Sequence, residues 1–150
     1  VNKIAPTIIA LKQMAIEANL SAIFFGHAGD GNIHANIIKN DLTDEEWTEK
    51  IEAYLDVLYA YVAKVGGKPS AEHGIGLLKK PFFQKYTGTS ELVAMKAIKR
   101  AFDPENILNP GKIFDLWQLK MFLFLWQRHF FKNLFFASYD KHLLTYEMMV

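Results

Sequence analysis

The chain has 150 residues, of which 51% are hydrophobic, and this length suits one domain with a core of its own. Seventeen Lys and Arg residues against sixteen Asp and Glu residues give a net charge of +1, which disfavours a partner that is nucleic acid. The absence of cysteine excludes disulfides and thiolate metal ligands, so that any metal must be held by His, Asp or Glu.

The first 114 residues have the pattern of an α+β domain. Apolar residues at spacings of three and four predict a helix from Pro6 or Thr7 to Asn19. Two short apolar runs, Ala22 to Phe25 and Ile33 to Ile38, lie on either side of a glycine-rich loop over residues 26–32. This pattern predicts two paired strands.

A second helix begins after Thr43, because Glu46 three residues later completes a capping box. Its apolar stripe extends to the glycine pair at 66 and 67, where the helix should end. The stripe consists of Trp47, Ile51, Leu55, Leu58 and Val62.

Lys68 to Ser70 could form a short strand before a second glycine-rich segment over residues 71–76. A further helix is predicted from Ser90 to Phe102, because apolar residues recur along it and Pro104 stops it.

The composition changes abruptly after Phe114. Residues 115–150 hold six of the twelve Phe and two of the three Trp, and no Gly or Pro. We therefore divide the chain into a domain over 1–114 and an aromatic-rich tail of unknown origin over 115–150. Polar and charged residues interrupt the apolar part of this tail, which excludes a membrane-spanning helix. We expect it to be an unrelated extension or the mistranslated end of a truncated reading frame, with no evolved partner, the alternative being an amphipathic surface anchor.

Three of the five histidines lie in or beside the two glycine-rich segments. His27 and His34 flank the first loop, and a turn there would bring both imidazoles to the open end of one hairpin. Glu72 could complete a His-His-Glu set, which suits a catalytic zinc or similar divalent ion with a position left for substrate or water. The alternative is that the loops merely turn and the histidines are structural.

His73 should point away from Glu72 if the backbone is extended there, because neighbouring side chains on a strand alternate. An imidazole with a near-neutral pKa is suited to accept a proton from a substrate oxygen. The alternative is a structural histidine that donates to a carbonyl.

Taken together, these segments resemble the C-terminal domain of the FAD-linked oxidases, within the group of the glycolate oxidase FAD-linked subunit, D-lactate dehydrogenase and D-2-hydroxyglutarate dehydrogenase. The resemblance runs from Val1 to Phe114 and rests on three motifs in order. They are Gly26-His27-Ala28-Gly29-Asp30-Gly31-Asn32-Ile33-His34, then Glu72-His73-Gly74-Ile75-Gly76 with Lys79, then Asp103-Pro104 with Ile107-Leu108-Asn109-Pro110-Gly111-Lys112.

The resemblance implies a fold and a set of roles. The fold would be α+β, the ferredoxin-like cap or substrate domain of these enzymes, here without the N-terminal FAD-binding domain. His27, His34 and Glu72 would ligate a divalent metal, zinc by preference, and Glu72 would thereby also contact the substrate. Asn36 would touch the substrate, and His73 would bind it and remove the proton of its 2-hydroxyl. Asn109 would approach the FAD.

We therefore expect part of an FAD-dependent oxidoreductase that oxidises a small D-2-hydroxy acid, such as glycolate or D-lactate, to the 2-oxo acid. Its partners would be that substrate and an FAD-binding domain or subunit, without which the chain should be inactive. Two rivals stay open, a stand-alone metal hydrolase that uses the same His-His-Glu set and a non-enzymatic interaction module. The first residues lack a charged leader followed by an apolar run, so we expect a cytoplasmic protein, and membrane association of the tail is not expected.

Overall fold

The structure is a computed structural model that describes residues 2–116 and 143–150. These residues belong to two compact units, which are described separately. The sheet unit consists of residues 2–74 and 143–150, and the helical unit consists of residues 75–116.

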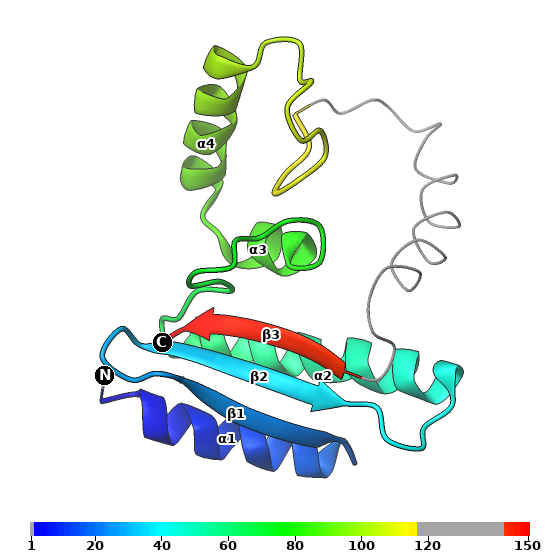
Figure 1. Cartoon of the computed structure of the whole chain (residues 1–150). Coiled ribbons are helices and arrows are strands. Elements are labelled where there is room, and N and C mark those ends of the chain that lie inside the picture. Colours follow the sequence, from blue (N-terminus) through cyan, green and yellow to red (C-terminus); the bar gives the residue numbers. More distant parts are fainter. Residues whose placement is uncertain (1, 117–142) are drawn as a thin grey trace. The chain divides into compact units, whose positions relative to one another are not determined.

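The sheet unit contains two helices and three strands (Figure 1). In chain order they are α1 (Ile4–Glu17), β1 (Ser21–His27), β2 (Asn32–Ile38), α2 (Asp44–Lys64) and β3 (Leu143–Met149). Both strand pairs are antiparallel, in the order β1-β2-β3, so that β2 is the central strand. The α+β class expected from the sequence is confirmed.

Alternation along β2 gives this sheet one covered face. Ile33, Ala35 and Ile37 are fully buried, whereas the residues between them point to the opposite face. Side chains from both helices complete the core, and the Tyr54 hydroxyl of α2 donates to the Leu11 carbonyl of α1 at 3.0 Å. The helical contribution comes from Leu11, Ala15, Trp47, Ile51, Tyr54, Leu55, Leu58, Tyr59 and Val62.

The start of α2 follows the sequence prediction closely. The Thr43 side chain accepts from the Glu46 backbone N–H at 3.2 Å, and the Glu46 carboxylate accepts from the Thr43 N–H at 2.9 Å. Hydrogen bonds from the Thr43 backbone N–H and the Thr43 side chain to the Glu46 carboxylate lower its pKa, because they favour its ionised form. The helix ends before Gly66, whose φ is +85°.

Two expectations about the end of this unit are wrong. Lys68 to Ser70 do not form a strand, and Lys68 makes only an isolated bridge with Met149. The last residues of the tail do have a partner in the domain, since β3 pairs with β2 along its whole length. Tyr146 and Met148 of β3 are buried in the core. The prediction failed because it was based on the aromatic-rich composition of residues 115–150 as a whole, which does not indicate the seven-residue strand at their end.

The close approach of β3 also explains one glycine. A Cβ at position 31 would lie 2.4 Å from the Val150 carbonyl oxygen, and Gly31 itself has a φ of +75°. The Gly31 carbonyl accepts from the Val150 N–H at 2.7 Å. The rest of the tail, residues 117–142, lies outside the described residues, and so does the proposal of an amphipathic anchor there.

The helical unit contains α3 (Lys80–Tyr86) and α4 (Thr89–Phe102), followed by an irregular segment to residue 116. The helix predicted from Ser90 is thus confirmed one residue earlier, whereas α3 was not predicted. Among the described residues, no helix is long and apolar enough to cross a membrane.

Candidate metal and substrate site

The β1–β2 hairpin brings His27 and His34 to the face of the sheet opposite the helices. His27 ends β1 and pairs with Asn32, while His34 of β2 pairs with Phe25. Side chains of neighbouring strands that share a face of the sheet lie side by side. The centroids of the His27 and His34 imidazoles are 5.9 Å apart. The predicted loop over 26–32 is shorter in the structure, because both strands extend into it and leave residues 28–31 as the turn.

Gly26 is needed where the two strands meet near the turn. A Cβ at this position would lie 2.1 Å from the Asn32 carbonyl oxygen, a distance at which a side chain cannot fit without a shift of the backbone. The glycine therefore allows the tight pairing that places both histidines at one end of the hairpin.

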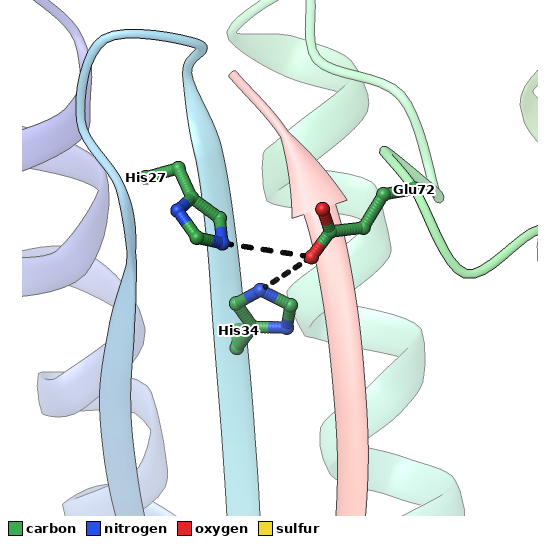
Figure 2. Close-up of side chains that lie close together, drawn as sticks. All are labelled: His27, His34 and Glu72. Atoms are coloured by element: carbon green, nitrogen blue, oxygen red, sulfur yellow. Dashed lines mark ion pairs between the residues drawn. The ribbon is translucent and has the colours of Figure 1, made fainter.

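Glu72 reaches the same place from the segment that follows α2. Its Oε1 lies 3.2 Å from Nε2 of His34 and 3.7 Å from Nε2 of His27 (Figure 2). The segment bends at residues 71–73, where the Ser70 hydroxyl donates to the Gly74 carbonyl at 3.0 Å and Gly74 has a φ of +76°. Glu72 thus lies on the open face although it is 38 positions away from His34 in the chain.

His73 also lies beside this carboxylate, with its Nε2 3.6 Å from Oε1 of Glu72. Its ring centroid is 5.1 Å from that of His34. The expectation that His73 points away from Glu72 is wrong, because residues 71–73 form a bend and not an extended strand. The carboxylate of Glu72 is therefore within 3.7 Å of three imidazoles.

Burial differs strongly within this cluster. The His34 side chain is 6% exposed, whereas those of His27, Glu72 and His73 are each about half exposed, at 59%, 50% and 56%. His34 is covered on one side by Phe25, whose ring stacks on it with centroids 5.0 Å apart and planes 16° apart. The cluster thus has one fixed imidazole at its base and accessible groups around it.

The donor set fits a divalent cation. One ligand atom from each of His27, His34 and Glu72 lies within 4.8 Å of the other two, and in the described part of the chain they are the one such group of metal-ligating side chains. Two imidazoles and one carboxylate suit zinc and related ions, and three protein ligands leave room for a substrate oxygen.

Asn36 belongs to the same face of β2, two residues beyond His34. Its Oδ1 is buried and has no hydrogen-bond partner among the described residues. An unpaired amide oxygen beside the cluster is available to a ligand.

Asn109 lies in the other unit, in the segment that follows α4. The Asp103 carboxylate organises this segment, because it accepts from the N–H groups of Ile107 and Leu108 at 3.0 and 2.9 Å. The ammonium of Lys99 also contacts this carboxylate, and the hydrogen bonds, led by that of Lys99, lower the pKa of Asp103. Asn109 itself has a φ of +49°, in the left-handed region that asparagine tolerates.

Sequence reasoning missed Asn32 and Phe25. Both share the open face with the histidines, Asn32 by alternation along β2 and Phe25 by its pairing with His34. The period of two along each strand is the signal that could have identified them. The alternation was not recognised at Asn32, because the glycine-rich pattern assigns that residue to the loop and not to the strand.

Comparison with known proteins identifies the family of this domain. Residues 1–113 match the family described as FAD linked oxidases, C-terminal domain. The chain is 39% identical over 112 residues to a D-lactate dehydrogenase of Anaerostipes hadrus and 37% identical over 113 residues to the glycolate oxidase subunit GlcD of Bacillus subtilis, in each case over 75% of this chain and 24% of the relative. It is 43% identical over 93 residues to a D-2-hydroxyglutarate dehydrogenase of Stutzerimonas stutzeri, which is 61% of this chain and 20% of the relative. The chain thus matches about a quarter or less of the length of these relatives.

Proposed function

Because this chain belongs to the FAD-linked oxidases through their C-terminal domain, we propose that it forms the substrate-binding part of an FAD-dependent dehydrogenase of small D-2-hydroxy acids. The substrate would be D-lactate, glycolate or a similar acid, and the product the 2-oxo acid. The observation that carries the proposal is the Glu72 carboxylate within 3.7 Å of three imidazoles on an open sheet face.

In this proposal, His27, His34 and Glu72 hold a divalent cation, with zinc as the first candidate. When bound, the cation acts as a Lewis acid toward the substrate's hydroxyl and carboxylate oxygens, and FAD accepts the hydride from C2. Two neutral imidazoles and one carboxylate leave a divalent site with a net positive charge, which favours an anionic substrate.

The remaining groups of the site act on the substrate directly. His73 accepts the proton of the 2-hydroxyl at a ring nitrogen, so that loss of one hydride and one proton yields the 2-oxo acid. The Asn36 amide, whose oxygen is buried without a partner among the described residues, contacts the substrate. Asn109 serves the flavin, and the remainder of the FAD site belongs to an FAD-binding domain or subunit. A cytoplasmic location and the lack of membrane association of the tail stay predictions.

A chimera tests this function. The part of the Anaerostipes hadrus relative that precedes the matched region would be joined to residues 1–150, and dye-linked oxidation of D-lactate, glycolate and D-2-hydroxyglutarate would be measured. We expect oxidation of at least one of these acids, and His73→Asn should lower turnover by roughly 10²–10⁴-fold while FAD stays bound.

Two results would contradict the proposal. A chimera that binds FAD and metal but oxidises none of these acids would exclude the activity. Metal-dependent hydrolysis of esters by the chain alone, without oxidation by the chimera, would favour the hydrolase alternative. Unchanged turnover in His73→Asn would reject only the assignment of the base.

A further inference from the structure

Two large apolar side chains of β1 lie beside the candidate site on the open face of the sheet. Phe25 pairs with His34 across the hairpin, and Ile23 pairs with Asn36. Phe25 is 49% exposed and Ile23 is 55% exposed. Apolar surface that stays exposed next to convergent polar groups is typical of ligand sites, where it contacts the apolar part of the ligand.

The position of the substrate in the proposed function brings it next to these two side chains. A 2-hydroxy acid that is bound at the cluster and contacts the Asn36 amide extends along β2 from His34 to Asn36. Residues directly opposite each other on neighbouring strands have Cβ atoms about 4.5–5.5 Å apart. Phe25 and Ile23 therefore border the substrate on the β1 side.

The same face offers little positive charge to a second carboxylate of a substrate. The alternate positions of the three strands that share this face include no Lys or Arg, and the position opposite His34 on β3 is Glu147. Lys68 makes its bridge on the outer side of β3, two strand spacings or about 10 Å from β2. Lys39, directly after β2, is buried, and its ammonium contacts the Asp44 carboxylate.

We propose that Phe25 and Ile23 form an apolar wall that receives the side chain carried by C2 of the substrate. The wall favours 2-hydroxy monocarboxylates with a short alkyl side chain over acids with a second carboxylate. Burial of an alkyl group is favourable, whereas burial of a carboxylate without a partner is costly. This inference rests on the proposed function and adds to it the residues that set its substrate range.

The test uses the whole chain loaded with Zn²⁺ and measures the Kd of a series of acids by ligand-observed NMR. The series is glycolate, D-lactate, D-2-hydroxybutyrate and D-2-hydroxyglutarate. Each alkyl carbon added from glycolate to D-2-hydroxybutyrate should lower the Kd by about two- to fourfold, because it is buried against the wall. D-2-hydroxyglutarate should bind no more tightly than glycolate, which has no side chain at C2.

Substitutions at Ile23 test the wall without changing a residue of the cluster. Ile23→Ala should raise the Kd of D-2-hydroxybutyrate by about threefold or more and leave that of glycolate unchanged. Ile23→Lys places a cation beside the substrate and should lower the Kd of D-2-hydroxyglutarate by about two- to fivefold. Val57→Ala, which shortens an exposed apolar side chain of α2, is the matched control and should bind all four acids as the wild type does.

Phe25→Ala needs the comparison with glycolate, because Phe25 also stacks on His34. A disturbance of His34 raises the Kd of every acid in the series, whereas loss of the wall raises the Kd of D-2-hydroxybutyrate relative to that of glycolate. We expect this ratio to rise by about threefold or more in Phe25→Ala.

Several results would overturn the inference while the proposed function stands. These are equal Kd values along the alkyl series, and equal changes for glycolate and D-2-hydroxybutyrate in both Ile23→Ala and Phe25→Ala. Tighter binding of D-2-hydroxyglutarate than of D-lactate would also overturn it, and the loss of that preference in Lys68→Ala would assign the second carboxylate to Lys68.

The chimera decides the question if the chain alone binds none of these acids. The same ratios are then measured as kcat/KM. A chimera that oxidises glycolate as efficiently as D-2-hydroxybutyrate overturns the inference, and one that binds FAD and metal but oxidises none of the acids excludes the proposed function itself.

Discussion

The two faces of the β1–β2–β3 sheet are formed by the same strands and differ in what buries their side chains. On the covered face, Ile33 and Ile37 are fully buried by apolar groups that include side chains of α1 and α2. On the open face, His34 is almost as well buried, but its neighbours are Phe25, Glu72 and His73. Alternation along a strand thus separates the residues that hold the fold from those that hold the candidate site.

This separation has an energetic meaning. A residue of the covered face stabilises the protein by removing apolar surface from water, whereas the polar groups of the open face must find partners or lose free energy on burial. Mutations on the two faces should therefore change different measurements, and the following experiments examine this difference, starting with the largest expected effect.

Deletion of residues 143–150 removes β3 and should have the largest effect. Tyr146 and Met148 are 5% and 0% exposed, and the loss of two such side chains from a core costs about 3–6 kcal/mol. The deletion also exposes the backbone hydrogen-bonding groups of β2, and an exposed strand edge favours pairing with another molecule. Chemical denaturation should show a much less stable or unfolded chain.

A point substitution in the same strand is the control for this deletion. Thr145 is exposed, so Thr145→Ala should change the free energy of unfolding by about 0.5 kcal/mol or less. An equally stable chain after the deletion would show that β3 does not contribute to the core, as the composition alone predicts.

Ile37→Ala and Ile23→Ala compare the two faces directly. Ile37 is 0% exposed, and its truncation should lower the free energy of unfolding by about 2–5 kcal/mol. Ile23 is 55% exposed on the open face, and the same change there should cost about 0.5 kcal/mol or less. Urea denaturation of both variants gives the comparison, and similar losses would mean that the open face is covered as fully as the other.

Changes at the cluster should affect the metal more than the fold. The purified chain should bind about one zinc-like ion, and His34→Ala or Glu72→Gln should lower its affinity by about 10–100-fold or more, because one of the protein ligands is lost. Glu52→Gln, at an exposed position of α2, is the matched control. Equal metal content in the wild type and the His27, His34 and Glu72 triple mutant would exclude the cation site.

The sequence predicted the parts of this molecule that depend on local patterns. The capping box at Thr43, the apolar stripe of α2 and the hairpin of β1 and β2 each follow from spacing within a few residues. The family motifs also contain the residues of the cluster, so the sequence was sufficient to identify them. Local patterns could not predict β3, because its pairing with β2 joins segments more than one hundred residues apart. They also missed the bend at residues 71–73 that turns His73 toward Glu72, since such a bend depends on contacts that a single segment does not record.

The capping box at the start of α2 belongs to neither face of the sheet. Substitutions in it should give the smallest change in the free energy of unfolding, and this change should depend on pH. Hydrogen bonds from the Thr43 backbone N–H and hydroxyl lower the pKa of Glu46, with a smaller contribution from Lys50, so the folded state favours the ionised carboxylate. A lowered pKa adds stability above the pKa of the unfolded chain, about 4.3–4.5, and this stability is lost as the pH falls through the folded value.

Glu46→Gln should remove this part of the pH dependence, so that stability falls less steeply at acid pH. Thr43→Ala should cost about 1 kcal/mol near neutral pH, because the helix loses its cap. Thermal unfolding between pH 3 and pH 7 of the wild type, both variants and Glu45→Gln as control measures the difference. Parallel curves for the wild type and Glu46→Gln would mean that the cap acts without the charge of Glu46.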